Sequence, residues 1–206
     1  DELAGMGTKE LYFSGGGEPF MHPDILPVLK HAKALSLECC VNTNFTLVNE
    51  KVVKQLVEMP LDALTVSVWA ATPQTYTLTH PNKDEAAFYR IKDTLKMLNA
   101  LKTGGRPFIK IYNVISNLNY REVEAMVDFA AETGSEAVEF TVVDTIPGAT
   151  DKLVLGPDER REILAQCERI QKKKTKVQVL NLEHFTRRLS DAGADQAEDR
   201  ELVLDV

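Results

Sequence analysis

A glycine-rich segment with one carboxylate is the part of the sequence best suited to bind a ligand. In the stretch SGGGEP, Gly15, Gly16 and Gly17 directly precede Glu18, and the strand-forming residues ELYF come before them. Glycines at a strand end let the backbone approach a ligand closely and leave N–H and C=O groups free to bind it. A carboxylate beside exposed carbonyls attracts cations and repels phosphate. The segment therefore predicts a site for an ammonium group, such as that of an amino acid.

Neither common phosphate-binding spacing occurs there, since the stretch has no GxxxxGK[ST] and no GxGxxG opening into a helix. Other polar residues come at the ends of further strand-like runs. These residues are Thr43, Asn44, Ser67, Trp69, Asn113, Asp144 and Thr145. In βα folds the carboxyl ends of parallel strands gather at one edge, and that edge carries ligands. We therefore expect these residues to lie on the same side of the molecule as the glycine segment.

Short apolar runs alternate with stretches of helical period along the chain, which is the pattern of a parallel sheet built from βα units. The predicted strands are 10–14, 37–43, 62–69, 108–115, 136–143 and, more weakly, 176–180. The predicted helices are 23–35, 48–58, 84–102, 119–133 and 157–173. We expect one curved, open parallel sheet, because only five or six strands are present. No low-complexity linker divides residues 1–206, which predicts a single domain.

Alternation along the third strand predicts which of its side chains face a ligand. Thr65, Ser67 and Trp69 would share one face, while the apolar residues between them share the other. The polar face would look into a barrel or cleft. Adjacent Cys39 and Cys40 should alternate in the same way, so that one of them faces the core.

Composition limits the classes of function. The net charge of -7 and the pI of about 5.2 argue against broad contact with nucleic acid. The basic run KKKTK at 172–176 is interpreted as a solvated helix end. No apolar run is long enough to span a bilayer, and three cysteines fit a reduced compartment, so we expect a cytoplasmic protein without membrane contact.

The order of these motifs resembles the core of the radical S-adenosylmethionine (SAM) superfamily. The motifs are a strand, then GGGEP and HPDILPVLKHAK, then a strand ending in TN, then a strand containing VSV, and they cover about residues 8–145. The resemblance implies a partial (βα)6 barrel that holds SAM and a [4Fe-4S] cluster. It also implies reduction of SAM to a 5'-deoxyadenosyl radical, which abstracts hydrogen from an unknown small-molecule or peptide substrate, with electrons from a separate donor.

The resemblance also assigns roles to individual residues. Gly16, Gly17 and Glu18 would hold the methionine amino group of SAM, with Gly15 and Pro19 shaping the turn. Other cofactor-binding positions would be Thr43, Asn44, Ser67 and, more loosely, Asn113. No metal ligand is assigned within the sequence.

The sequence departs from the family pattern in two places. The cluster-binding C-x3-C-x2-C segment that precedes the GGE motif in the family does not occur, and Cys39 and Cys40 have neither its spacing nor its location. Trp69 stands where many members carry an aspartate. We expect a longer parent protein that supplies the cluster from an upstream segment, with a cysteine-rich SPASM-type extension downstream. The alternative is a SAM-binding or regulatory βα domain without a cluster.

Three further residues have two interpretations each. His22 could reach the ligand edge, but it is expected to pack beside a helix start. Trp69 could stack on a substrate, but it is expected to pack at the barrel mouth. His80 lies in a polar loop that could contact a ligand, but the expected role is that of an ordinary loop residue. A conventional βα-barrel lyase or hydrolase is disfavoured, because no Lys, His or carboxylate pair is recognisable at the strand ends.

Overall fold

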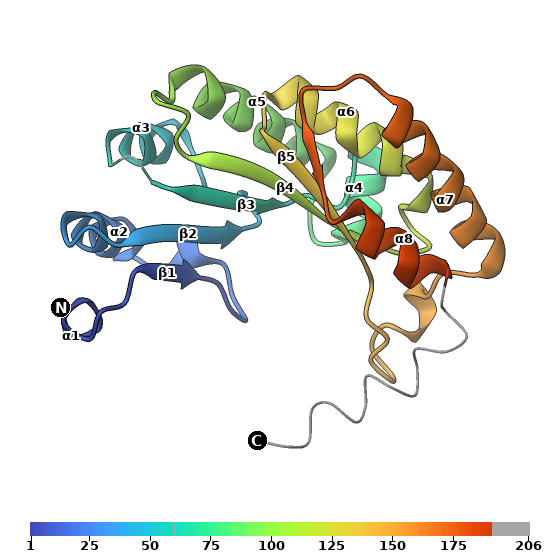
Figure 1. Cartoon of the computed structure of the whole chain (residues 1–206), viewed down its shortest axis with the longest axis horizontal. Coiled ribbons are helices and arrows are strands. Elements are labelled where there is room, and N and C mark those ends of the chain that lie inside the picture. Colours follow the sequence, from blue (N-terminus) through green and yellow to red (C-terminus); the bar gives the residue numbers. More distant parts are fainter. Residues whose placement is uncertain (60, 191–206) are drawn as a thin grey trace.

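Six parallel strands form one sheet in the computed structural model, which describes residues 1–59 and 61–190 (Figure 1). The strands are β1 (Glu10–Phe13), β2 (Glu38–Thr43), β3 (Ala63–Ser67), β4 (Phe108–Ile115), β5 (Ala137–Val142) and β6 (Gln178–Leu180). Each strand pairs with the next one along the chain. The predicted open parallel sheet is confirmed, and all six predicted strands are present.

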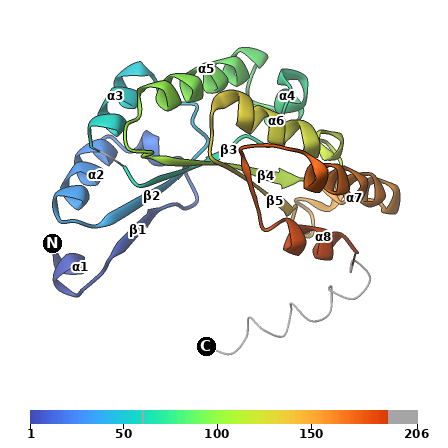
Figure 2. The ribbon, with the colours of Figure 1, turned by 45° about the horizontal axis from the view of Figure 1, so that its top comes forward.

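Helices connect the strands and cover the convex face of the sheet (Figure 2). The α-helices are α1 (Glu2–Gly5), α2 (Ile25–Ala34), α3 (Glu50–Glu58), α4 (Pro73–Thr79), α5 (Glu85–Leu101), α6 (Val123–Thr133), α7 (Pro157–Lys172) and α8 (Leu182–Ser190). Short 3-10 turns are η1 (Pro19–Met21), η2 (Tyr120–Glu122) and η3 (Asp151–Leu153). The core lies between the helices and the sheet, and the concave face is left open.

Alternating burial along each strand separates the core from the open face. In β4, Ile109, Ile111 and Ile115 are buried beneath the helices, while Lys110 and Tyr112 between them are half-buried on the concave side. In β2, Cys39 is fully buried and Cys40 is half-buried, as the alternation predicted. The concave face is therefore polar because of the sequence of each strand, before any loop contributes to it.

Local signals fix several helix ends. The Asn49 side chain accepts a hydrogen bond from the Val52 N–H at the start of α3, and Gly134 ends α6 with a φ of 77°. Asn119 does not begin α6 as predicted, because η2 intervenes. The helices α4 and α8 were not predicted from the sequence. The residues ELVLDV at 201–206, whose composition is typical of a strand, lie outside the described residues.

No helix in residues 1–59 or 61–190 is both long and apolar enough to cross a membrane.

Candidate functional site

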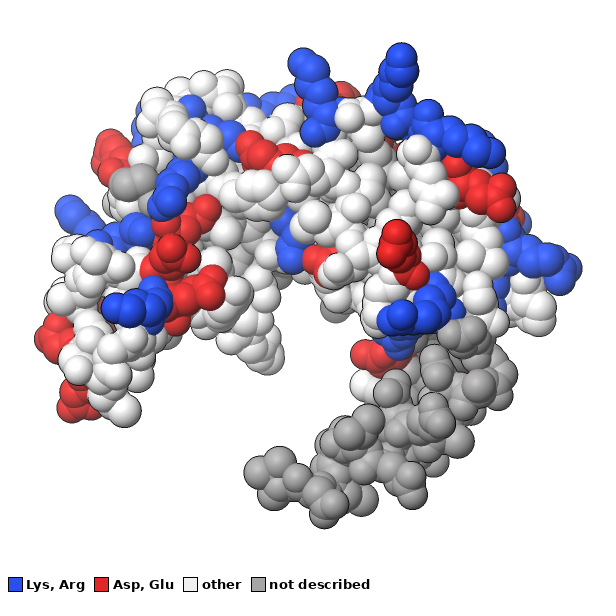
Figure 3. Space-filling view, in the orientation of Figure 1, with Lys and Arg blue, Asp and Glu red and all other residues white. Residues whose placement is uncertain are grey.

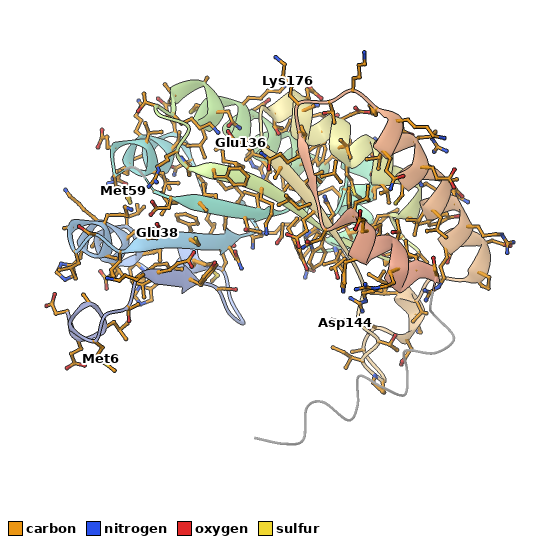
Figure 4. The ribbon with its side chains drawn as sticks, in the orientation of Figure 1. Met6, Glu38, Met59, Glu136, Asp144 and Lys176 are labelled. Atoms are coloured by element: carbon orange, nitrogen blue, oxygen red, sulfur yellow. The ribbon has the colours of Figure 1, made fainter. Side chains whose placement is uncertain are left out.

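A cavity of about 660 Å³ occupies the concave face at the carboxyl ends of the strands. Figure 3 shows the hollow beneath the arch that the described residues form. Figure 4 labels Glu38, Glu136 and Lys176 at the starts of β2, β5 and β6, and Asp144 after the end of β5. Strands β1 to β5 or the loops that follow them all contribute side chains to the cavity. The predicted convergence of polar residues at this edge is confirmed for most of the set.

The glycine segment has an open surface that the described residues do not fill. Gly15 has a φ of 153°, which favours glycine, whereas Gly16 and Gly17 need no positive φ. A Cβ atom added at Gly16 or Gly17 would meet no atom within 4 Å in residues 1–59 and 61–190, its chain neighbours aside. Folding alone therefore does not require glycine at these two positions, and the open space beside the backbone can take a ligand at close approach.

The Glu18 carboxylate at the edge of the cavity accepts three hydrogen bonds from the protein. Its Oε1 accepts hydrogen bonds from the Thr43 hydroxyl at 2.6 Å and the Phe20 N–H at 3.2 Å. Its Oε2 accepts one from the Asn44 N–H at 2.7 Å. An ionised carboxylate offers about four lone-pair positions, so acceptor capacity remains for one further donor. A fixed anion with a free lone pair suits an ammonium group.

The TN pair at the end of β2 positions this carboxylate. Thr43 is buried, and its Oγ1 accepts a hydrogen bond from the Phe45 N–H at 2.8 Å while donating to Glu18. The Asn44 side chain instead accepts from the N–H and hydroxyl of Thr46. Thr43 and Asn44 therefore meet Glu18 through one hydroxyl and one backbone N–H.

The structure brings most, though not all, of the predicted site residues together. Among the predicted cofactor-binding residues, those that line the main cavity are Gly15, Gly17, Glu18, Thr43, Asn44 and Ser67. Gly16 and Pro19 line a second, more apolar cavity of about 440 Å³, which lies between the glycine segment and α2. His22 lines this second cavity as well. Thr65 and Trp69 line the main cavity with Ser67, as the alternation along β3 predicted.

Asn113 lies on the other face of its strand. It is fully buried on the helix-covered side, and its Oδ1 accepts a hydrogen bond from the Trp69 N–H at 3.0 Å. Asn119 acts on the same residue, because its Nδ2 donates to the carbonyls of Trp69 and Val114 at 2.9 Å. Trp69 has a φ of 59°, which is unusual for a bulky residue. The two asparagines thus hold a strained backbone turn at the cavity wall.

Replacing Asn119 with alanine should destabilise the protein by about 3 kcal/mol. The substitution removes three hydrogen bonds of a side chain that is 2% exposed, each contributing about 1 kcal/mol. Urea unfolding measures the loss. Asn113→Ala is the matched control, since it removes one hydrogen bond, and it should cost about a third as much. Equal losses in the two variants would contradict this account of the turn.

Lys110 and Glu139 form an ion pair within the cavity, contrary to the expectation that no such pair gathers there. Lys110 Nζ donates to Glu139 Oε2 at 2.6 Å, and Asn181 Nδ2 donates to the other carboxylate oxygen at 2.9 Å. Burial acts to raise the pKa of Glu139, but the hydrogen bonds from Lys110 and Asn181 outweigh it and lower the pKa. Period-two alternation in β4 and β5 was the signal that could have found both residues.

His80 also lines the cavity. Its ring stacks on Tyr76 with centroids 4.4 Å apart, and Trp69 lies 5.3 Å from it. Burial lowers the pKa of His80, which favours the neutral ring at pH 7. Nδ1 lies 3.2 Å from the Tyr76 carbonyl oxygen and 3.0 Å from the Thr79 hydroxyl oxygen, so both groups hold the ring in place. Trp69 packs at the cavity mouth, as expected.

The three cysteines do not approach one another as cluster ligands would. Cys39 and Cys167 are buried in the core, and Cys40 Sγ donates to Glu10 Oε1 at 3.2 Å. Burial and the nearby Glu10 raise the pKa of Cys40 to about 12, which disfavours the thiolate that binds metal. Within residues 1–59 and 61–190, no group of three or more His, Cys, Asp or Glu residues could hold a metal ion.

The comparisons with known proteins agree with this geometry. The family model described as the Radical SAM superfamily matches residues 1–130. The chain belongs to this superfamily. Radical SAM proteins use SAM and a [4Fe-4S] cluster, and the partial-barrel fold predicted from the motifs is confirmed.

Two curated relatives indicate the range of the superfamily around this chain. A probable GTP 3',8-cyclase of Thermococcus kodakarensis is 31% identical over 131 residues, which cover 63% of this chain and 40% of the relative. An AdoMet-dependent heme synthase of Methanosarcina barkeri is 30% identical over 149 residues, which cover 71% of this chain and 40% of the relative. The chain thus spans well under half of the length of these enzymes.

The solved structure is that of Streptococcus suis SuiB bound to S-adenosylmethionine. It superposes with a TM-score of 0.63 at 19% identity, covering 82% of this chain and 38% of that one. SuiB bound to precursor peptide SuiA superposes with a TM-score of 0.59 at 17% identity, covering 82% of this chain and 37% of SuiB. At this level of identity the likeness shows the fold alone.

Proposed function

We propose that this chain is the SAM-binding core of a radical SAM enzyme. The observation that carries the proposal is the pairing of Glu18, held by Thr43 and Asn44, with a glycine segment whose open face none of the described residues fills. That arrangement suits the ammonium group of SAM, with the methionine backbone lying against the glycines. Ser67 and Thr65, which face the same cavity, would hydrogen-bond polar atoms of the cofactor.

Different residues around the cavity would bind the cofactor and orient the groups that bind it. Glu18 fixes the amino group, and Thr43 and Asn44 fix Glu18. Asn113 and Asn119 act indirectly, because they hold the Trp69 turn that forms the wall beside Ser67. The cavity lies on the concave face, with the strands as its floor, and it is open on the side away from the sheet.

We assign the ligands of the [4Fe-4S] cluster to a segment upstream of this sequence in the parent protein. The support is the placement of Cys39, Cys40 and Cys167, two in the core and one bonded to Glu10. When bound, the cluster would supply the electron for reductive cleavage of SAM to methionine and a 5'-deoxyadenosyl radical, which would abstract hydrogen from the substrate. A separate cytoplasmic electron donor would reduce it. The substrate is a small molecule or a peptide.

The full-length parent protein, reconstituted anaerobically with iron and sulfide and reduced with dithionite, should convert SAM to 5'-deoxyadenosine. Chromatography of the reaction products measures it, and protein without iron and sulfide is the control. SAM binding without formation of 5'-deoxyadenosine in the cluster-loaded protein would reject the proposed chemistry and favour the cluster-less SAM-binding alternative. Failure to bind SAM at all would reject both.

A further inference from the structure

The ion pair of Lys110 and Glu139 has no role in the proposed amino-group site, although it lies in the same cavity. Lys110 is on β4 and Glu139 on the neighbouring strand β5, and both project from the concave face. Their side chains are 26% and 17% exposed, so they are largely shielded from bulk water yet reachable from the cavity. A charged pair in such a position can meet a ligand directly.

The sheet register shows that one amino acid cannot occupy both sites. Thr43, which binds Glu18, is aligned through Val66 with Ile111, and β2 and β4 are separated by β3. Strands lie about 4.8 Å apart, so the backbones of Thr43 and Lys110 are roughly 10 Å apart. Lys110 also reaches toward β5, away from Glu18.

The amino and carboxylate groups of SAM share one Cα, each joined to it by a bond of about 1.5 Å. If the ammonium lies at Glu18, the carboxylate therefore remains several ångströms from the Lys110 ammonium. The ion pair is therefore available to a second ligand. This inference rests on the proposed function, in which SAM fills the first site.

The pair presents a cation with free donors. Both carboxylate oxygens of Glu139 accept a hydrogen bond, one from Lys110 and one from Asn181. Lys110 Nζ donates to Glu139 and makes no other hydrogen bond in the described part of the chain, so two of its three N–H groups remain. Nζ lies 5.9 Å from the centre of the Tyr112 ring, which also helps to place it.

Charge balance points to the sign of the second ligand. Glu18 and Glu139 give the cavity two carboxylates against the single ammonium of Lys110. SAM carries an ammonium, a sulfonium and one carboxylate, and so one net positive charge. Once SAM is bound, the cavity is close to neutral, and an anionic group is no longer repelled on approach to Lys110.

We propose that Lys110, held by Glu139, binds a carboxylate group of the enzyme's substrate beside SAM. The substrate class is thus a carboxylic acid or a peptide with an acidic side chain or terminus. Glu139 is a positioning residue, which accepts a hydrogen bond from the Lys110 ammonium at the cavity floor and is itself held by the Asn181 amide.

The test uses the cluster-loaded full-length protein and two probes, N-acetylglutamate α-amide, which carries one carboxylate, and its uncharged analogue N-acetylglutamine α-amide. Ligand-observed NMR titration with SAM present should show the acid binding about tenfold more tightly than the amide, as expected for one charge-assisted hydrogen bond. Omitting SAM should reduce the preference. Equal binding of the two probes would overturn the proposal.

Lys110→Met should abolish the preference for the acid while leaving the affinity for SAM within twofold of the parent. Lys176→Met is the matched control, because Lys176 is exposed at the start of β6, away from the carboxyl-end cavity (Figure 4). A loss of SAM affinity in Lys110→Met with the acid preference intact would assign Lys110 to SAM and overturn the proposal.

Glu139→Gln gives a second readout with the opposite sign. It removes the competing negative charge and keeps the side-chain shape, so the acid should bind several-fold more tightly. A cross-strand pair that only stabilises the sheet would change the melting temperature in both variants and leave the acid preference unchanged, which would refute the assignment. If the parent protein fails to bind SAM yet prefers the acid, the proposed function is wrong and the carboxylate site stands.

Discussion

Replacing Glu18 with glutamine should weaken SAM binding by roughly ten- to a hundredfold. The substitution keeps the shape of the side chain and removes the charge that the SAM ammonium meets, which corresponds to about 1.5 to 3 kcal/mol. The structure adds a second reason. A glutamine amide nitrogen in the place of Oε2 would face the Asn44 N–H, which is also a donor. Calorimetry on the cluster-loaded full-length protein measures the affinity.

The matched control for this change is Glu136→Gln. Glu136 is also a carboxylate that accepts from a backbone N–H, that of Ile109 at 2.8 Å, and it forms an ion pair with Lys102. It lies at the opposite edge of the sheet, before β5 (Figure 4). Glu136→Gln should lower stability and leave SAM affinity unchanged. If Glu18→Gln remains folded and binds SAM as tightly as the parent, the segment is only a turn.

Replacing Gly17 with valine should reduce SAM affinity by roughly ten- to a hundredfold and leave the melting temperature almost unchanged. Within the described residues, a Cβ atom at Gly17 meets no atom within 4 Å beyond its chain neighbours, and the residue needs no positive φ, so we expect folding to tolerate the substitution. It would occupy space beside the main cavity, where overpacking against a ligand costs about 1 to 3 kcal/mol. Calorimetry and thermal unfolding together separate the two effects.

Gly134→Val is the contrasting variant. Gly134 has a φ of 77° and a Cβ there would lie 3.3 Å from Asn99 Cβ, so the substitution strains the end of α6. It should lower the melting temperature and leave the SAM affinity of the folded protein unaltered. A valine at Gly17 that destabilises the fold as much as one at Gly134 would show that the glycine segment serves folding rather than ligand approach.

The sequence by itself determined the parallel sheet and the edge of it at which the candidate site lies. Period-two alternation of apolar residues in strands such as β3 and β4 fixes which face is buried, since a one-residue shift would expose Leu64 or Ile109 to water. The order of the strands then follows from short βα connections. Local chemistry fixed the ends of α3 and α6, because Asn49 caps the first and Gly134 alone can take the left-handed turn of the second.

Only the tertiary structure decided which polar residues meet. Lys110 and Glu139 are 29 positions apart, and their contact depends on the register of β4 against β5, which a pattern within one strand cannot specify. Asn113 had the residue type of a ligand contact, but its parity along β4 placed it beneath the helices, where it holds Trp69. Likewise, the sequence motifs pointed to Glu18, Thr43 and Asn44. The hydrogen bonds by which Thr43 and Asn44 fix the Glu18 carboxylate form only because β1 and β2 lie side by side.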